Sequence, residues 1–368
     1  MADVFQSGAQ IDLATLFAPL HPFIKRDAQL AARMRVAKAM VPAPPDALIP
    51  ALLFLGNDPE KQVKDAAIES LVSMPAAMLM PAISQAKNEI LLDNFARMLR
   101  KNDDAIREVV LNNHTADDTI RYLASVGTVH VCDTIGRNQM RALRYPAIIE
   151  AIYLNPRAPH GVVQGLLELA VRSLLPLDHL PGFRETKAIL GGEESDDGNA
   201  GLSDAEFASA MMMATSMMSD NPNEEVQEKR SQNLQQLISK MSVAQKVRIA
   251  MVGDASVRKF LIRDPKKIVA MSVLKSPRLT EGEVTLFAAN KTLNDDLMKL
   301  ICRNRLWTKD YATRKALVFN PKTPMAFALG FLKTLSLKDV KDCSSSRDVN
   351  QTVARAAKRQ MSPDKKHE

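Results

Sequence analysis

The stretch Ala147-Ile-Ile-Glu-Ala-Ile-Tyr-Leu-Asn-Pro-Arg-Ala-Pro159 decides the fold, because the chain repeats its pattern as Ala316-Leu-Val-Phe-Asn-Pro-Lys-Thr-Pro324. Looser copies run over 106–115 and 268–280. Each copy is a short apolar segment followed by a polar corner. A unit that recurs every few tens of residues is typical of a stacked repeat array. We therefore expect such an array here.

The phrase describes a helix that ends abruptly. Ile148, Ile149 and Ile152 give the first segment an apolar side that can pack on neighbours. Pro156 then ends the helix, because proline has no N–H to donate and disfavours helical backbone at the preceding residue. The phrase therefore predicts a helix followed by a sharp corner.

A second helix is expected to start soon after each corner. Thr323 before Pro324 suits an N-cap followed by proline at the first helical position. The spacing of a capping box occurs at Thr280–Glu283 and, in a weaker form, at Thr115–Asp118. Repeated corners of one type would stack neighbouring helix pairs in one sense.

The spacing of the corners indicates the size of the unit. If Pro75, Asn113 and Pro156 are equivalent, they lie 38 and 43 residues apart, and Pro277 precedes Pro321 by 44. These values match paired- or triple-helix repeats of the HEAT and armadillo size class. Aromatic residues are only 5% of the chain, and its apolar positions hold mostly Leu, Ala, Met and Ile, a composition that favours helix. We predict an all-α fold, an irregular right-handed α-solenoid in two halves.

The corner also resembles that of a known class. A short apolar helix, the order Asn-Pro-x-Thr-Pro and a second helix are similar to the leucine-rich repeat variant family and, more broadly, to HEAT and armadillo solenoids. The matching residues are Asn155, Pro156 and Pro159, and Asn320, Pro321, Thr323 and Pro324. The resemblance implies an all-helical superhelix. Two departures are the spacing, about twice that family's unit, and the absence of the clustered cysteines of an iron–sulfur centre.

Charge divides the chain unevenly. Residues 1–239 hold 22 Lys and Arg against 30 Asp and Glu, whereas residues 240–368 hold 27 against 12. Such asymmetry indicates contact with nucleic acid or a membrane by the basic half, or two faces that attract each other. We expect an acidic helical half at 1–190, an acidic Gly-rich loop and Met-rich helix at 191–233, a basic helical half at 234–343 and a basic, fraying tail at 344–368.

The basic half supplies the candidate binding residues. They are Arg258, Lys259, Arg263, Lys266, Lys267, Arg303, Arg305, Trp307, Tyr311, Arg314 and Lys315. On a curved solenoid these side chains could line one face and contact phosphates. The aromatic pair is four residues apart and would share a face of one helix. The alternative is a solvated basic surface, or one that meets the acidic half.

No catalytic motif is present in the sequence, so we expect no catalytic residue, cofactor or metal. His130 and Cys132 form the one close His/Cys pair, which lacks two of the ligands that a zinc site needs. A small buried cysteine beside a polar residue is the simpler interpretation. Two Asp pairs, 103–104 and 117–118, are expected to lie at helix starts, where the helix dipole favours carboxylates.

The Met-rich segment 206–218 has two interpretations. Adjacent methionines would cover all sides of a helix, which suits an adaptable docking surface. The alternative is a helix buried between the two halves.

The compartment is predicted from what the sequence lacks. Three cysteines lie far apart, no basic and apolar leader opens the chain, and no window holds 18 uninterrupted apolar residues. We expect a cytoplasmic protein without a membrane span. Its oligomeric state is left open.

The function that these features favour is a non-catalytic interaction scaffold that holds a protein partner, of acidic character, through its basic half. The alternative is a nucleic-acid-binding repeat protein that uses the same half, and an enzyme ranks third. A protein-docking surface predicts exposed apolar patches beside the charges. Phosphate binding predicts an affinity that falls steeply with salt.

Overall fold

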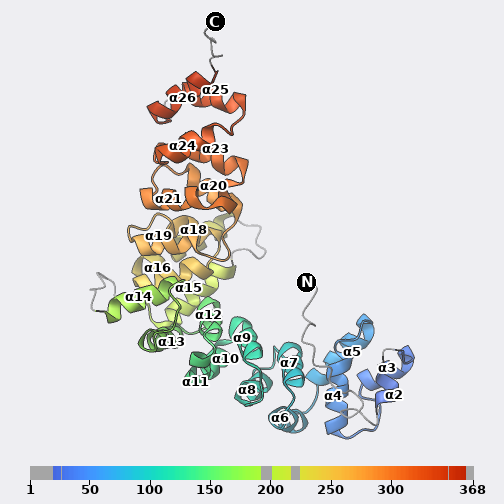
Figure 1. The fold of residues 1–368 in the computed structure, drawn as a ribbon. Coiled ribbons are helices and arrows are strands. Elements are labelled where there is room, and N and C mark those ends of the chain that lie inside the picture. Colours follow the sequence, from blue (N-terminus) through green and yellow to red (C-terminus); the bar gives the residue numbers. More distant parts are fainter. Residues whose placement is uncertain (1–19, 26, 192–200, 217–223, 347, 362–368) are drawn as a thin grey trace. The chain divides into compact units, whose positions relative to one another are not determined.

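The computed structural model describes residues 20–25, 27–191, 201–216, 224–346 and 348–361, and every regular element within these ranges is an α-helix (Figure 1). The predicted all-α fold is confirmed. The chain divides into two compact units, Met1–Leu175 and Pro176–Glu368, called unit 1 and unit 2 below. This division comes before the boundary predicted at residue 190. Much of the predicted Gly-rich loop lies outside the described residues.

Unit 1 contains helices that are mostly short. They are α2 (His21–Ile24), α3 (Leu30–Ala37), α4 (Pro45–Leu55), α5 (Lys61–Val72), α6 (Ala76–Ser84), α7 (Glu89–Met98), α8 (Asp103–Leu111), α9 (Asp117–Val126), α10 (Val129–Arg137), α11 (Gln139–Arg144), α12 (Ala147–Leu154) and α13 (His160–Arg172). Helix α8 contacts α6 and α10, and α9 contacts α7 and α12. Ile106, Val109 and Val110 bury one side of α8, with the spacing of an apolar helical stripe.

Unit 2 begins with α14 and continues into pairs of helices. They are α14 (Pro181–Leu190), α15 (Asp204–Ser216), α16 (Glu224–Lys240), α17 (Val243–Val252), α18 (Ala255–Leu261), α19 (Lys267–Leu274), α20 (Glu281–Ala289), α21 (Asp295–Arg303), α22 (Arg305–Thr308), α23 (Tyr311–Phe319), α24 (Met325–Leu332), α25 (Leu337–Ser345) and α26 (Gln351–Met361). The predicted tail therefore contains a helix, α26, which packs on α24 and α25.

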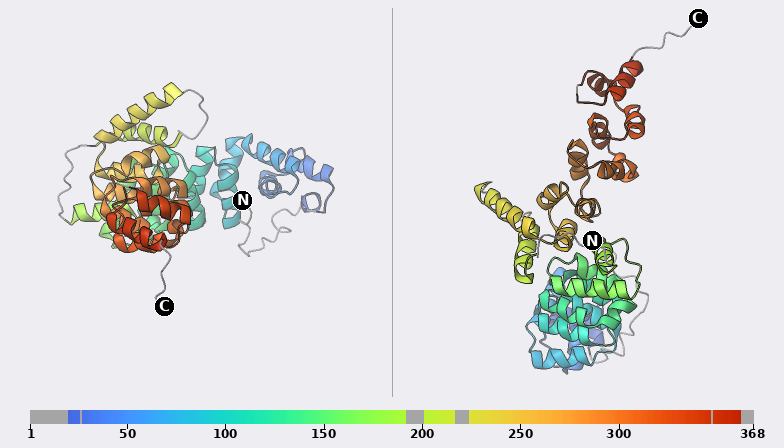
Figure 2. Two further views of the ribbon diagram at one scale, coloured as in Figure 1. Left: turned by 90° about the horizontal axis from the view of Figure 1, so that it is seen from above. Right: turned by 90° about the vertical axis from the view of Figure 1, so that its left-hand side faces the viewer.

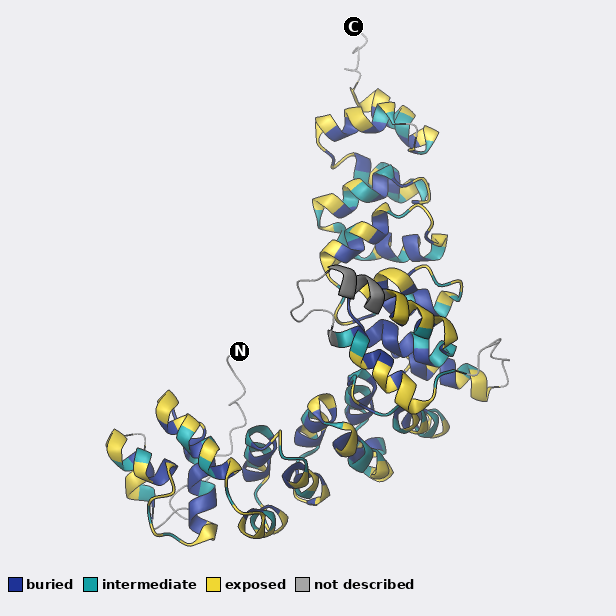
Figure 3. Ribbon diagram, turned by 180° about the vertical axis from the view of Figure 1, so that it is seen from behind, coloured by how far each residue is buried: buried dark blue, intermediate teal, exposed yellow. Residues whose placement is uncertain are grey.

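From α18 onward the helices of unit 2 lie in two stacks (Figures 1 and 2). The first stack contains α18, α20, α23 and α25, each in contact with the next. The second stack contains α19, α21, α24 and α26. Buried residues lie between neighbouring helices and exposed residues on the outer surfaces (Figure 3). Apolar burial between successive helices therefore stabilises this part of the chain.

Asparagines at helix ends connect helices that are far apart in sequence. Asn320 Nδ2 donates to the carbonyls of Ala288 (2.8 Å) and Asn290 (3.0 Å), at the end of α20. Asn155 Nδ2 donates in the same way to Ala124 and Gly127, at 2.8 and 3.0 Å. All of these contacts are made by buried side chains. Each amide thereby satisfies carbonyls that have no partner within their own helix.

A third such joint is formed by Asn112, which donates to carbonyls at the end of α6, including that of Ile83 at 2.8 Å. The Oδ1 atom of each joint asparagine accepts from the backbone N–H two residues later, which closes the corner locally. The three Asn corners are therefore built alike.

The threonines of two corners have a role other than the one predicted. Thr323 and Thr115 are not N-caps, because α24 begins after Pro324 and α9 after Ala116. Their hydroxyls instead donate to carbonyls of the preceding helix, Leu317 and Val109, each at 2.6 Å. The capping box at Thr280–Glu283 is confirmed.

The repeat spacing also differs from the one predicted. Asn290 and Asn320 end adjacent helices of the first stack, and each accepts from the N–H two residues later. They lie 30 residues apart. Pro277 follows α19 of the second stack, so the 44-residue spacing joins corners of different stacks. Sequence inspection misses Asn290 because no proline follows it.

The predicted Met-rich helix corresponds to α15. Phe207, Ala210, Met211 and Ala214 are buried on one side, whereas Met212 is 70% exposed. Helix α15 contacts α16 and α17. The methionines described therefore occupy both a buried stripe and an outer surface, and residues 217 and 218 lie outside the described ranges.

Candidate interaction surface

The eleven predicted binding residues have different environments in the structure. Lys259, Arg263, Arg303 and Arg305 are exposed, and no described carboxylate pairs with them. Lys266 and Trp307 are half-buried. The remaining five make contacts within unit 2. They are Arg258, Lys267, Tyr311, Arg314 and Lys315.

Arg258 belongs to a buried ion pair between α18 and α20. Its guanidinium contacts both carboxylate oxygens of Glu283, at 2.8 and 3.0 Å, and donates to the Gly253 carbonyl at 2.6 Å. Burial acts to raise the pKa of Glu283, but hydrogen bonds from Arg258 and Thr280 outweigh it and lower the pKa. Arg258 is only 3% exposed, so its guanidinium connects α18 to α20 and does not form part of the surface.

A second polar cluster joins α23 to α25. Lys315 Nζ lies 2.7 Å from Asp339 Oδ1, and the Tyr311 hydroxyl donates to Asp339 Oδ2. Together with Ser336, these partners lower the pKa of Asp339 to about 2. Arg314 donates to the Thr308 carbonyl at 3.2 Å, with its guanidinium 5.8 Å from the centre of the Tyr311 ring.

The predicted aromatic face on one helix is not present. Trp307 lies in α22, whereas Tyr311 is the first residue of α23. Asp310 is the N-cap of α23, so the two aromatic residues belong to separate helices. The spacing of four residues therefore does not place them side by side on a continuous helix.

A row of four cations lies at the C-terminal ends of the second stack. Lys275, Arg303, Lys333 and Arg359 come at or near the ends of α19, α21, α24 and α26. They are spaced by 28, 30 and 26 residues. Of these four, the set predicted from sequence includes Arg303 alone. The near-regular spacing of these basic residues in the sequence is the signal from which Lys275, Lys333 and Arg359 could have been predicted.

Two contacts at the opposite ends of these helices show that the helices run the same way. Lys267 at the start of α19 pairs with Asp296 at the start of α21, at 2.5 Å. Lys322 Nζ, just before α24, donates to the Leu293 carbonyl just before α21, at 2.8 Å. A further pair, between Lys291 just before α21 and Asp348 just before α26, relates α26 to them in the same way. Since the N-terminal ends of α19, α21, α24 and α26 lie on one edge, their C-terminal ends share the other edge. We call the edge that carries the four cations, with Arg305 and Lys309 of the α22 segment, the cationic edge.

The two edges differ in how their charges are compensated. On the N-terminal edge, Lys246 pairs with Asp264, Lys267 with Asp296, and Lys291 with Asp348 at 2.9 Å. Along the cationic edge, no carboxylate of the described residues lies within ion-pair distance of the four cations. The lysines of the N-terminal edge are therefore paired with carboxylates, whereas the four cations of the row have no partner among the described carboxylates.

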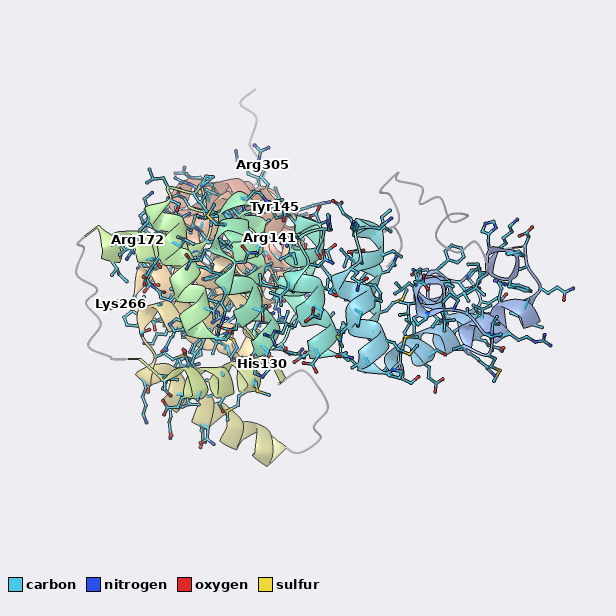
Figure 4. All side chains as sticks on the ribbon, turned by 90° about the horizontal axis from the view of Figure 1, so that it is seen from below. His130, Arg141, Tyr145, Arg172, Lys266 and Arg305 are labelled. Atoms are coloured by element: carbon cyan, nitrogen blue, oxygen red, sulfur yellow. The ribbon has the colours of Figure 1, made fainter. Side chains whose placement is uncertain are left out.

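Lys275 shows the local effect of this excess charge. Burial lowers the pKa of its ammonium group, and the positive charge of Arg184 lowers it further. Two cations thus lie near each other without a described carboxylate to compensate them. Arg305, farther along the edge, is exposed and extends away from the ribbon (Figure 4).

Two exposed apolar side chains lie on adjacent helices of the first stack. Phe260 of α18 and Leu286 of α20 each come six residues after the N-cap of their helix. They are 41% and 65% exposed. Lys259 directly precedes Phe260, and Lys315, which pairs with Asp339, comes five residues after the N-cap of α23. We call Phe260 and Leu286 the apolar step; basic residues flank it.

The other residues singled out in the sequence lie in unit 1 and have structural contacts. Cys132 is buried, and its Sγ lies 3.2 Å from Asn155 Nδ2, while His130 is exposed. Within the described ranges, no group of three His, Cys, Asp or Glu side chains could hold a metal ion.

The paired aspartates lie at the starts of α8 and α9, as predicted. Asp103 accepts from the Thr128 hydroxyl at 2.8 Å. Asp117 and Asp118 bind Arg141 and Tyr145, which lie close together at the end of α11 (Figure 4). These carboxylates thus lie at helix N-termini and connect α8 to the start of α10 and α9 to the end of α11.

Two grooves in the surface contain charged side chains singled out in the sequence. One, of about 740 Å³, lies between α8 and α10 and is lined by Asp104, His130 and Asp133 among others. Another, of about 300 Å³ in unit 2, is lined by residues that include Arg263 and Lys267.

No single helix in the part of the chain that the structure describes has both the length and the hydropathy to cross a bilayer. Helices α5 and α6 would pass only as a pair bent by 98°.

Comparison with known proteins gives no match to a family model, to a curated protein or to a solved structure. The functional argument therefore depends on the residues of this chain.

Proposed function

We propose that the protein is a non-catalytic scaffold, built as an irregular right-handed α-solenoid, that binds an acidic protein partner through the first stack of unit 2. The apolar step carries this proposal. Phe260 and Leu286 expose large apolar side chains at equivalent positions of adjacent helices. Exposed apolar groups beside charged ones are typical of protein-docking surfaces.

The charge around the apolar step suggests the chemistry of the partner. Lys259 directly precedes Phe260 and Arg263 follows it by three residues; both are exposed and have no partner among the described carboxylates. A helix that places leucines on one face and glutamates beside them would cover the apolar step and meet these cations. The proposed setting is the cytoplasm, supported by three buried cysteines without disulfide bonds.

The test uses a synthetic peptide. A fluorescent amphipathic helix with a leucine face flanked by glutamates is titrated with the full-length protein, beside an analogue with glutamine in place of glutamate. The double variant Phe260→Ser/Leu286→Ser should weaken binding by about tenfold or more, because buried apolar anchors carry most of the affinity of an interface.

The matched control changes two exposed apolar residues of unit 1, Leu111→Ser/Met140→Ser, which are 55% and 78% exposed. It should bind the peptide as the unmodified protein does. Equal binding by the control and the Phe260/Leu286 variant would refute the proposal. Equal binding of the glutamine analogue would refute the acidic character of the partner.

A further inference from the structure

We propose that the cationic edge of unit 2 binds the phosphate backbone of a nucleic-acid duplex. This edge lies at the C-terminal ends of the second-stack helices, whereas the apolar step belongs to the first stack, with Phe260 near the C-terminal end of α18 and Leu286 within α20. The proposal therefore has its own residues and does not depend on the scaffold function.

The arrangement of the row fits a long anion. Four helices each contribute one cation within about one turn of the C-terminal end: Lys275, Arg303, Lys333 and Arg359. Packed helices lie about 8–10 Å apart, so the cations recur at about that interval along the edge. A single small anion could reach only one or two of them. A polymer with phosphates along its length can contact all four.

Compensation of helix dipoles does not explain the row. A cation near any helix C-terminus is favourable, and this effect applies equally to both stacks. In the first stack, however, the last turns of α20, α23 and α25 contain no basic residue, and of the two in α18, Arg258 is buried in an ion pair with Glu283 while Lys259 is exposed. Counting the last turn and the C-cap, each of the four second-stack helices carries a basic residue, whereas in the first stack α18 alone does.

The fold also leaves these charges available. No carboxylate among the described residues pairs with the four cations, in contrast to the N-terminal edge, where Lys267 and Lys291 are paired. The proximity of Arg184 to Lys275 adds to the positive field at the start of the row. Release of counterions from phosphates makes such an uncompensated row favourable for nucleic acid.

The side chains beside the row favour a duplex over a single strand. Single strands are held largely by aromatic side chains on which bases stack. Here Trp307 is half-buried, and Tyr311 is bound through its hydroxyl to Asp339 and has Arg314 near its ring. Tyr311 is 37% exposed, but its hydroxyl and ring are both engaged within unit 2. Cations beside aromatic side chains that are half-buried or engaged suit contacts to phosphate, which position a duplex without reading its sequence.

The experiment measures binding of the full-length protein to a fluorescent random-sequence DNA duplex by anisotropy, at KCl concentrations from 50 to 200 mM. The variant Arg303→Gln/Lys333→Gln removes two cations of the row. The matched control Lys291→Gln/Lys299→Gln removes the same charge from lysines that are paired with Asp348 and Asp296. Thermal unfolding curves establish that both variants are folded.

The unmodified protein should bind, and the magnitude of the negative slope of log K against log salt should fall by about 2 in the Arg303/Lys333 variant, at about 0.9 per lost phosphate contact. The control should keep the slope of the unmodified protein. If the Arg303/Lys333 variant fails to fold, Lys275→Gln/Arg359→Gln tests the same row and should give the same fall.

Three results would overturn the proposal. The first is absence of binding at 50 mM KCl. The second is an equal fall in slope for the row variant and the control, which would reduce the effect to net charge. The third is tighter binding of a single strand or of polyglutamate than of the duplex, lost in the same row variant, which would assign the edge to another class of partner.

Discussion

A single side-chain amide, that of Asn320, holds together two helices that begin 30 residues apart. Its Nδ2 group donates to two carbonyls at the end of α20, and its Oδ1 accepts from the N–H of Lys322. Asn320 is 4% exposed, so water cannot easily replace these bonds. The residue thus fixes both a local turn and a contact between helices.

The variant Asn320→Asp should lower the free energy of unfolding of unit 2 by about 2 kcal/mol, because it keeps the acceptor but removes the donor and leaves buried carbonyls unsatisfied. The one tryptophan, Trp307, reports this in urea titrations followed by fluorescence. Thr334→Ala, an exposed control, should change stability by less than about 0.5 kcal/mol. An unchanged urea midpoint for Asn320→Asp would contradict the role of the amide.

Asp339 predicts a response to acid. Its folded pKa of about 2 lies below the value of about 3.9 for an unfolded aspartate. The carboxylate therefore contributes stability above about pH 4, and this contribution is lost as pH falls from about 4 toward 2. Asp339→Asn should be less stable than the unmodified protein at pH 7, and the difference should shrink as pH falls. A difference in urea midpoint that stays constant from pH 7 to pH 3 would speak against it.

At the scale of elements, α26 closes one end of unit 2. Val353 and Ala357 are buried in a cluster with Val340 and Cys343. Burial raises the pKa of the Cys343 thiol, so while α26 is docked this thiol is both covered and a poor nucleophile. The reactivity of Cys343 therefore reports whether α26 is in place.

Val353→Asp should undock α26 by placing a charge among apolar side chains. Cys343 should then react with an alkylating reagent at a rate at least about tenfold higher than in the unmodified protein, because its thiol becomes accessible. Peptide mass spectrometry distinguishes it from Cys132 and Cys302. Gln351→Asp adds the same charge at an exposed position and should leave the rate unchanged. Equal rates for the two variants would mean that α26 does not protect Cys343.

Local chemistry decides which elements can be predicted. Pro156 and Pro321 each directly follow the asparagine at which a helix ends, and Thr280 with Glu283 forms a cap from neighbours in sequence. The sequence does not predict that the Thr323 hydroxyl donates to the Leu317 carbonyl, because this bond depends on the backbone conformation of the corner between α23 and α24. The same applies to Arg258, whose buried partner Glu283 lies 25 residues away. From composition alone, Arg258 is expected on a basic surface; only the packing of α18 against α20 shows that it is buried.

For the whole molecule, the charge pattern predicted the more basic part but not the division between units. The chain divides between Leu175 and Pro176, where the sequence shows no change in charge or complexity. Contacts across many residues set that boundary. The cationic edge could be inferred only from the structure, which shows which basic side chains are paired with carboxylates and which are not. The amino-acid composition does not distinguish the two groups.

Each unit has its own core, so damage to one should not spread to the other. Leu92→Ala, at a fully buried position of α7, should lower the stability of unit 1 by about 3 kcal/mol. Hydrogen exchange measured by mass spectrometry should show faster exchange in peptides of unit 1 and unchanged exchange in those of unit 2. Leu261→Ala in α18 should give the reverse pattern. Faster exchange in both units for either variant would mean one cooperative transition.

The Asn corners have a consequence for how such a chain can change its length. Each corner contains an amide donor that reaches back and, in the helix ends before it, the carbonyls that accept. A duplicated segment that ends in Asn would bring a donor for the segment before it and acceptors for the segment after it. At both new junctions between segments, the asparagine amide would find carbonyl acceptors without further substitutions. Gene duplication within the chain could therefore lengthen it while every buried amide and carbonyl keeps a partner.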